Sequence, residues 1–193
     1  MIEVVGDMWT YPAEWRCITT NGMVKNDGCL VMGGGCALEA KQRYPGIDHK
    51  LGTMVEAFGN KPYTIELYKL ITLPTKHDWK DNSDIDLIVY GAKILAEFVK
   101  VNNIKSIVIP RPGCGLGGLN WDDVKKVLEP IFDTDAFIII SNNTKEISPY
   151  NRGLKGKDKE NPFPENSDAW VEWNTGHNDS IKDKYFGIPN DQR

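Results

Sequence analysis

Several features are scarce in this chain of 193 residues, and each absence excludes a class of protein. No apolar run approaches the roughly 18–20 residues that a membrane-spanning helix needs, so we expect no membrane partner. The first residues lack the basic and apolar regions of a secretory signal peptide, which predicts a cytoplasmic protein. The chain has 23 Lys+Arg against 27 Asp+Glu, a net charge of −4. This balance argues against a broad nucleic-acid-binding surface, although a pocket could still accept one anionic ligand.

Cysteine is also scarce, and the four cysteines form no Cys-x-x-Cys motif. Neither a disulfide framework nor a zinc site is predicted, and a reduced cytosol fits this usage. We interpret all four as free thiols that act as small apolar side chains, and we expect no metal and no cofactor. The four are Cys17, Cys29, Cys36 and Cys114.

Short apolar strands alternate with amphipathic helices, which predicts an α/β fold with an at least partly parallel sheet. Wholly apolar segments such as 107–109 and 137–140 are typical of strands covered on both faces. A three-and-four spacing of apolar residues predicts a long helix up to Asn102, with Ser83 as its cap. We expect strands at 2–5, 16–20, 63–67, 69–73, 106–109 and 137–140, and helices at 36–44, 49–58, 83–102 and 121–132.

The composition changes after about residue 148, which predicts a domain over 1–148 and a tail over 149–193. Residues 151–164 are polar and rich in helix breakers. We therefore interpret their cations as part of a solvated linker rather than as a binding patch. The tail beyond them is too aromatic for a pure linker, so we expect it to dock on the domain of a monomeric protein. Its aromatic residues are Trp170, Trp173, Tyr185 and Phe186.

Glycine is the residue type that stands out, with 18 in the chain, several of them in two clusters. Gly33–Gly35 and Gly113–Gly118 each lie between a predicted strand and a predicted helix. Such a loop presents bare backbone N–H groups and a helix N-terminus, which together bind phosphate well. The second cluster also matches the dinucleotide fingerprint. We discount that match, because two prolines separate strand from loop and no acidic residue ends a following strand.

The segments around the glycine clusters resemble the macrodomain family over about residues 1–141. The resemblance rests on Gly6-Asp7, Asn21-Gly22, the segment from Val31 to Glu39 and the segment from Pro110 to Trp121. It implies a three-layer α/β/α sandwich with a mixed, partly parallel central sheet. It also implies that the ligand is ADP-ribose or an ADP-ribosylated macromolecule.

The same resemblance implies a role for individual residues. Asp7 would accept a hydrogen bond from the adenine amino group, and the two glycine loops would clasp the diphosphate and the distal ribose. Asn21 would lie near that ribose, and the end of the last strand near the adenosine. The implied ligand-binding residues are Asp7, Met8, Asn21, Gly33, Gly34, Gly35, Cys36, Pro110, Gly113, Cys114, Gly115, Leu116, Gly117, Ser141 and Asn142.

Within the family, the segment 73–79 is similar to the antitoxin branch, which strips ADP-ribose from thymidine in DNA by means of a lysine. That lysine corresponds to Lys76. A related glycohydrolase branch carries an aspartate where this chain has Gly117, whereas the antitoxins have glycine there. The three-glycine first loop is less typical of antitoxins and also resembles ADP-ribose 1″-phosphate phosphatases. The assignment to one branch therefore stays open.

Cleavage of an ADP-ribosyl linkage needs stabilisation of charge at the anomeric carbon and a proton for the leaving group. A neutral Lys76 could attack the opened sugar as a Schiff base, whereas a protonated one could steer the leaving group or the phosphates. Asn21 and His77 are the other candidate catalytic residues, although a lone loop histidine is usually just solvated. Arg111 could pair with a phosphate or form a salt bridge, and Trp79 and Trp121 could be core or pocket wall.

Three functions remain open from the sequence. The first is hydrolysis of an ADP-ribosyl linkage on a nucleobase or an acidic side chain, which needs Lys76. The second is a non-catalytic module that binds ADP-ribose or a related nucleotide signal. The third is an ADP-ribose 1″-phosphate phosphatase that depends on Asn21 and His77. If the substrate is modified DNA, the acidic balance predicts a local contact, with Lys76, Lys80 and Arg111 as candidates.

Overall fold

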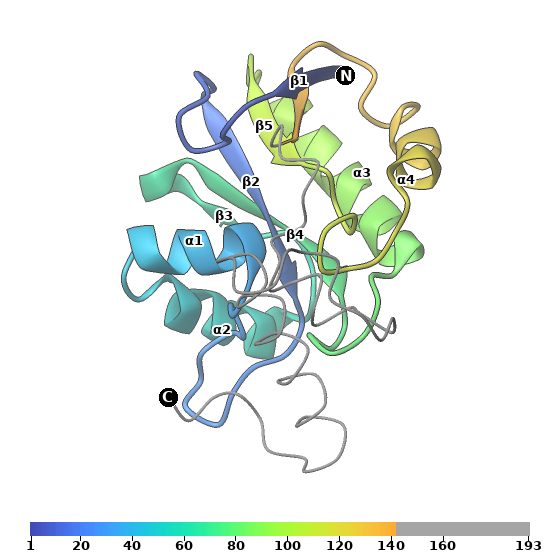
Figure 1. Ribbon diagram of the computed structural model, residues 1–193. Coiled ribbons are helices and arrows are strands. Elements are labelled where there is room, and N and C mark those ends of the chain that lie inside the picture. Colours follow the sequence, from blue (N-terminus) through green and yellow to red (C-terminus); the bar gives the residue numbers. More distant parts are fainter. Residues whose placement is uncertain (142–193) are drawn as a thin grey trace, which may run out of the picture. The chain divides into compact units, whose positions relative to one another are not determined.

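The computed structural model describes residues 1–141, which form one mixed sheet between helices (Figure 1). The strand order is β1-β6-β5-β2-β4-β3, and every neighbouring pair is parallel except β3 with β4. The strands are β1 (Ile2–Val5), β2 (Trp15–Asn21), β3 (Thr64–Ile65), β4 (Leu70–Lys76), β5 (Ile107–Pro110) and β6 (Phe137–Ser141). The helices are α1 (Gly35–Arg43), α2 (Ile47–Phe58), α3 (Ile85–Val101) and α4 (Trp121–Leu128), with a 3-10 turn at Glu66–Tyr68.

Helices cover both faces of the sheet, with α1 and α2 on one side and α3 and α4 on the other (Figure 1). Strand β5 shows why, because Ile107 and Ile109 belong to the core cluster on the α3 and α4 side. Val108 points the other way and belongs to the cluster on the α1 and α2 side. A strand that is apolar on both faces needs two covering layers. The predicted three-layer α/β/α sandwich is confirmed.

The ends of two helices differ from the sequence prediction. Asp84, not Ser83, caps α3, because its carboxylate accepts hydrogen bonds from the N–H groups of Asp86 (2.8 Å) and Leu87 (3.3 Å). Helix α4 ends at Leu128 rather than at residue 132. Phe132 lies beyond it, fully buried, with its ring stacked on that of Phe137 at 4.4 Å between centroids.

The strand predicted at 63–67 is also shorter in the structure. Only Thr64 and Ile65 pair with β4, and the chain then turns through Glu66–Tyr68. Lys69 takes a left-handed conformation (φ 50°) that ends the turn before β4 begins. Strand β4 in turn extends to Lys76, three residues beyond the predicted end at Leu73. That extension places Lys76 on the sheet instead of in a loop.

The strand order creates a switch point beside β2. After β2 the chain returns as β4 on one side, and it then crosses to form β5 on the other side. Loops that leave neighbouring parallel strands towards opposite faces open a crevice at the carboxyl edge of the sheet. The loop after β2 contains Gly33–Gly35, and the loop after β5 contains Gly113–Gly118. The topology therefore brings both glycine clusters to one place.

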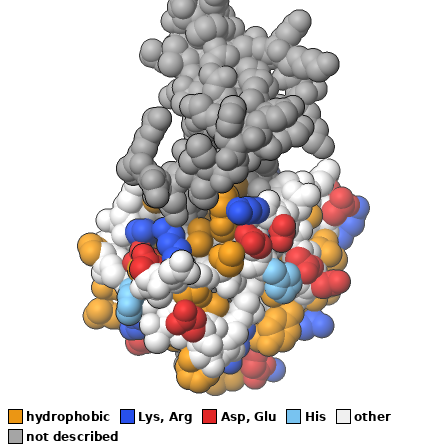
Figure 2. Space-filling model, turned by 90° about the horizontal axis from the view of Figure 1, so that it is seen from below, with side chains coloured by type: hydrophobic (Ala, Val, Ile, Leu, Met, Phe, Trp, Pro, Cys, Tyr) orange, Lys and Arg blue, Asp and Glu red, His pale blue; other side chains and the backbone are white. Residues whose placement is uncertain are grey.

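The chain divides into two units, Met1–Asn143 and Thr144–Arg193. The predicted boundary at residue 148 and the predicted docking of the tail lie outside the described residues. Among residues 1–141, no helix combines the length and apolar character needed to cross a bilayer. Figure 2 shows acidic and basic side chains intermixed over the visible face, as expected for a net charge of −4.

Candidate functional site

The carboxyl ends of β1 and β6 lie side by side at this edge. Val5 pairs with Ser141, and the Gly6 N–H donates to the Ser141 carbonyl at 3.0 Å. Asp7 follows directly, and its Oδ1 accepts a hydrogen bond from the Trp9 N–H at 2.9 Å. Asp7 is exposed and shapes the turn after β1, whereas the next residue, Met8, is buried. The structure places Asp7 and Met8 just after the end of β1, beside Ser141 at the end of β6, whereas Asn142 lies outside the described residues.

Arg16 holds that turn in place. Its Nε donates to the Met8 carbonyl at 3.0 Å, and its Nη2 donates to the carbonyls of Trp9 (3.2 Å) and Tyr11 (2.9 Å). A planar guanidinium can satisfy several fixed acceptors at once, which an ammonium cannot do with the same geometry. Arg16 was not predicted from the sequence, because its partners are backbone carbonyls that only the fold brings near.

A second set of contacts joins the same turn to α1. The Trp9 indole N–H donates to the Glu39 carboxylate, and the Arg43 guanidinium lies over the Trp9 ring at 4.4 Å from its centroid. Both Glu39 and Arg43 belong to α1, the helix that follows the first glycine loop. The turn after β1 and that loop are therefore held on one framework.

The first glycine loop leads directly into α1. Gly34 is the N-cap in an extended conformation, and within the described residues no side chain caps the helix. Gly35 has φ 54°, a region that other residues rarely adopt. The first N–H groups of a helix have no partner within it and carry the positive end of its dipole. An uncapped, glycine-rich helix start of this kind is suited to an anion.

The second glycine loop follows β5 and is closed by its own backbone. The Leu119 N–H donates to the Gly113 carbonyl at 3.0 Å, and the Ser83 N–H donates to the Gly117 carbonyl at 2.9 Å. A Cβ on Gly117 would lie 2.0 Å from Ser83 Oγ and 2.5 Å from the Gly113 oxygen. No side chain fits at that position without a shift of the backbone. This explains in physical terms why the chain carries no aspartate there.

The two glycine loops touch through Leu116. A Cβ on Gly34 would lie 2.6 Å from Leu116 Cδ1, so the leucine side chain packs directly against the first loop. The Lys76 amine donates to the Leu116 carbonyl and to the Trp79 carbonyl, both at 3.2 Å. The amine at the end of β4 is therefore anchored to the second glycine loop.

Asn21 is the cross-strand partner of Lys76, beside a bulge at the ends of β2 and β4. Its Nδ2 donates to the Val31 carbonyl at 2.8 Å, and its Oδ1 accepts from the Met23 N–H at 2.9 Å. Asn21 thus braces the segment that leads to the first glycine loop. From the other side, Asn60 Nδ2 donates to the Lys76 carbonyl at 2.9 Å. The structure brings Asn21 and Lys76 together at the ends of β2 and β4 and adds Asn60.

His77 has a different partner. Its Nε2 lies 3.3 Å from Asp84 Oδ2, and the imidazole side chain is 67% exposed. The backbone N–H groups of Leu87 and Asp86, followed by His77, hold the pKa of Asp84 below its usual value. The ring is thus paired with the N-cap of α3.

Two cysteine side chains lie in the glycine loops, and both pKa values are raised. Burial raises the pKa of Cys36, whose sulfur accepts a hydrogen bond from the Thr19 N–H at 3.2 Å. Burial also raises the pKa of Cys114 to about 11. Both thiols therefore stay protonated near neutral pH and are poor nucleophiles. This agrees with the interpretation of the cysteines as small apolar side chains.

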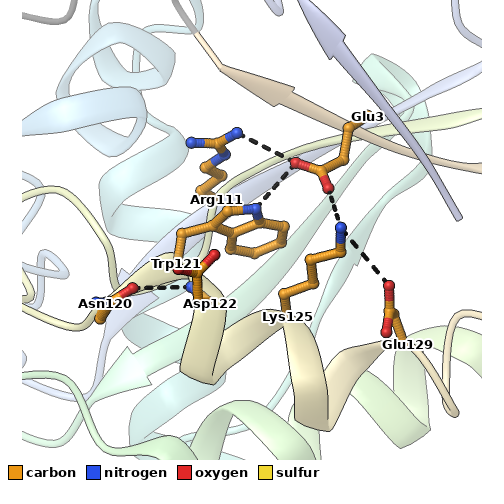
Figure 3. A network of polar contacts seen from close by, with 7 residues as sticks. All are labelled: Glu3, Arg111, Asn120, Trp121, Asp122, Lys125 and Glu129. Carbon is orange, nitrogen blue, oxygen red and sulfur yellow. Dashed lines mark hydrogen bonds and ion pairs between the residues drawn. The ribbon is translucent and has the colours of Figure 1, made fainter.

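A polar cluster around Glu3 fixes the start of the second glycine loop (Figure 3). The Glu3 carboxylate accepts from Lys125 Nζ (2.6 Å), Trp121 Nε1 (2.9 Å) and Arg111 Nη2 (3.1 Å). The Arg111 guanidinium also lies over the Trp121 ring, 5.2 Å from its centroid. Of the two interpretations left open for Arg111, the structure shows the salt bridge. The partner, Glu3 on β1, was missed because it is distant in sequence.

Together these features define an α/β protein in which two glycine loops, one uncapped helix start and one lysine anchored between backbone carbonyls lie at the carboxyl edge of the sheet. We call this edge the crevice. Residues 1–141 contain no cluster of three or more His, Cys, Asp or Glu side chains arranged to hold a metal ion. The donors available to an anion are mainly backbone N–H groups.

Comparison with known proteins identifies the family. The model of the Macro domain family matches residues 27–128, more than half of the chain. The chain belongs to the macrodomain family.

Its relatives include a DNA ADP-ribosyl glycohydrolase of Mycobacterium tuberculosis, 33% identical in an alignment 133 residues long that covers 62% of this chain and 38% of that protein. The macrodomain of Mycobacterium tuberculosis DarG matches in structure with a TM-score of 0.64 at 28% identity, over 74% of this chain and 97% of that one. Thermosipho africanus DarTG in complex with ADP-ribose matches with a TM-score of 0.62 at 23% identity, over 75% of this chain and 42% of that one. The last likeness shows the fold alone. The chain spans about two fifths of the length of the curated relative.

Proposed function

We propose that this macrodomain binds ADP-ribose and hydrolyses an ADP-ribosyl linkage on a nucleobase of DNA, with Lys76 as the essential residue. The observation that carries the proposal is the Lys76 amine, held 3.2 Å from the Leu116 carbonyl of the second glycine loop. Family membership and a relative named DNA ADP-ribosyl glycohydrolase support the substrate class.

The proposed ligand pose follows the strand ends. The diphosphate lies between the two glycine loops, where backbone N–H groups and the start of α1 supply donors. The adenosine lies towards Asp7 and Ser141, at the paired ends of β1 and β6. The distal ribose then lies towards Asn21 and Lys76, which pair at the ends of β2 and β4. This pose spans the switch point of the sheet, where open α/β sheets bind their ligands.

Lys76 could act at the distal ribose in either protonation state. As a neutral amine it attacks the anomeric carbon and forms a Schiff base. The bonds from that carbon to the base nitrogen and to the ring oxygen break, and the two amine protons pass to those two atoms. Water then hydrolyses the Schiff base, which releases ADP-ribose and restores the amine. As an ammonium it donates a hydrogen bond to the departing base or to the phosphates. The carbonyls of Trp79 and Leu116 orient the amine for both roles.

Substitution of Lys76 tests the assignment. We expect Lys76→Ala to lose at least about a hundredfold in hydrolysis of an ADP-ribosylated oligonucleotide, within the usual range for loss of acid–base chemistry. The Kd for ADP-ribose should change little, because backbone groups bind the diphosphate. Lys93→Ala, at an exposed position on α3, is the matched control. Full activity of Lys76→Ala would overturn the assignment. Lys76→Arg separates the two roles, because only the steering role survives a guanidinium.

Two other functions give distinct outcomes in the same assay. A pure binding module would bind ADP-ribose tightly and form no product from modified DNA, modified protein or ADP-ribose 1″-phosphate. A phosphatase would release inorganic phosphate from the last of these. It would depend on Asn21 and His77, whose side chains instead contact Val31, Met23 and Asp84. These contacts favour the lysine-dependent reaction.

We also propose that the protein is cytoplasmic and monomeric and that its contact with modified DNA is local. Free thiols at Cys17, Cys29, Cys36 and Cys114 fit a reducing compartment. Light scattering of the full chain tests the oligomeric state, and a dimer would contradict it.

A further inference from the structure

We propose that Trp79 is a stacking platform for the nucleobase next to the modified one. The inference rests on the proposed function, because it concerns what surrounds the same scissile linkage. It goes beyond that function by assigning a second contact site, outside the glycine loops, to the nucleic acid that carries the ADP-ribose.

Trp79 is an aromatic side chain left in solvent. The residue is 40% exposed, in the turn between β4 and α3. The Lys80 ammonium lies over one face of the ring, 5.3 Å from its centroid, so a base would stack on the opposite face. Proteins that bind single strands combine aromatic faces, on which bases stack, with nearby cations. A large, partly covered indole beside a lysine offers both.

The platform is held next to the reacting group. The Lys76 amine donates to the Trp79 carbonyl at 3.2 Å and to the Leu116 carbonyl at the same distance. One ammonium therefore joins the backbone of the platform to the second glycine loop. A ligand whose distal ribose meets Lys76 would place the attached base, and the residue after it, towards this turn.

The turn that carries Trp79 is closed at both ends. The Asp84 N–H donates to the Thr75 carbonyl at 2.9 Å, and the Ser83 N–H donates to the Gly117 carbonyl at 2.9 Å. Within the turn, the Lys80 N–H donates to Asp78 Oδ1 at 3.0 Å. The platform is thus anchored before a ligand arrives, which lowers the entropy cost of binding.

The charges of the turn favour a base over a phosphate as the main contact. Asp78 and Asp81 lie in the same turn as Lys80, so the local charge is not strongly positive. A surface meant for phosphates would carry a cluster of cations. Stacking on an indole needs no such cluster, because every base has an aromatic face. Single-stranded DNA exposes that face, whereas a duplex buries it.

The test compares two substrates of the full chain. One is a single-stranded oligonucleotide with one ADP-ribosylated base in its middle, and the other is the ADP-ribosylated nucleoside without neighbours. We expect Trp79→Ala to lower kcat/KM for the oligonucleotide about tenfold, which corresponds to about 1.4 kcal/mol. The value for the nucleoside should stay within about twofold. Trp79→Phe should retain most of the wild-type kcat/KM for the oligonucleotide, because it keeps an aromatic ring.

Tyr90→Ala is the control, since Tyr90 is also an exposed aromatic, on α3, and 51% of its side chain is accessible. An equal loss of kcat/KM on both substrates in Trp79→Ala would overturn the proposal, because Trp79 would then only position Lys76. An unchanged value for the oligonucleotide, or an equal loss on an ADP-ribosylated peptide, would overturn it as well. If the wild-type chain hydrolyses neither molecule, the proposed activity fails. The same two molecules are then stable ligands, and the ratio of their Kd values still tests Trp79.

Discussion

At the scale of single residues, three side chains of the crevice bind backbone groups rather than other side chains. Arg16 gathers three carbonyls, Asn21 bridges two main-chain groups, and Lys76 donates to two carbonyls. Each contact fixes a loop at the edge of the sheet. Hydrogen bonds from charged donors are among the stronger ones in proteins, so each loop is held by a few residues.

Gly117 gives a direct test of this construction. A Cβ there would lie 2.0 Å from Ser83 Oγ, so Gly117→Ala must move the loop or α3. We expect a loss of about 1–3 kcal/mol in the free energy of unfolding, the range for overpacked sites. Differential scanning calorimetry measures it. Gly33→Ala is the control for stability alone, since no described atom lies within 4 Å of its added Cβ. A Gly117→Ala chain as stable as this control would contradict the crowding.

Sequence reasoning found the residues whose roles depend on local chain order. The glycines had a local signal, and so did Lys76 in the segment 73–79, although the structure alone placed that lysine at a strand end. Arg16 and Glu3 had none, because their partners are carbonyls or side chains that only the fold brings near. Glu3 and Arg111 lie more than a hundred positions apart in the chain.

At the scale of elements, β1 is a short strand at one edge of the described sheet, and Glu3 fastens it. Its carboxylate joins β1 to α4 through Lys125 and Trp121, and to the second glycine loop through Arg111 (Figure 3). A shift of α4 would therefore move Glu3 and, through Arg111, the start of that loop. The cluster couples the stability of an edge strand to the shape of the crevice.

This coupling predicts a pH dependence. Hydrogen bonds from Lys125, Trp121 and Arg111 lower the pKa of Glu3 below its ordinary value of 4.5, with Lys125 the largest cause. The stabilisation is therefore present above that ordinary value and is lost as pH falls through the lowered pKa. Glu3→Gln should cost about 1 kcal/mol at neutral pH, since the pair is partly solvated.

Urea unfolding of both chains at neutral pH and at about pH 3 measures this difference, which should shrink at the lower pH. Asp123→Asn is the matched control, because the Asp123–Lys126 pair is largely exposed at 3.1 Å and should contribute little. A difference between Glu3→Gln and wild type that stays constant with pH would contradict the role of the carboxylate.

Element existence was predicted from the sequence, whereas some element ends were not. Apolar runs and helical spacing found all the helices and strands of the described residues. The start of α3 was ambiguous because Ser83 and Asp84 are both good caps, and the backbone geometry chose Asp84. The end of α4 had a local signal, because Pro130 lacks the N–H that would continue the helix, and the predicted helix to residue 132 ran past it. Beyond the helix, Phe132 packs on Phe137.

At the scale of the whole molecule, the strand order makes the site. The sequence predicted strands and two glycine clusters but not that the chain changes direction beside β2. That change places the two loops against each other, with Leu116 packed on Gly34. The acidic chain can then meet a diphosphate with backbone N–H groups instead of a basic surface.

This arrangement predicts a weak salt dependence for binding of the modified strand. In Figure 2 acidic and basic side chains alternate over the visible face, and the net charge is −4. Each phosphate neutralised on a single strand changes the slope of log K against log salt by about −0.7. Few such contacts are available, so we expect a slope no steeper than about −1.4.

Titration of an ADP-ribosylated oligonucleotide at several salt concentrations measures the slope, with ADP-ribose alone as the reference. The two ligands should differ by no more than one or two phosphate contacts, because the platform adds a base rather than a track of phosphates. A slope steeper than about −3 would mean four or more neutralised phosphates. Such a value would contradict a local contact.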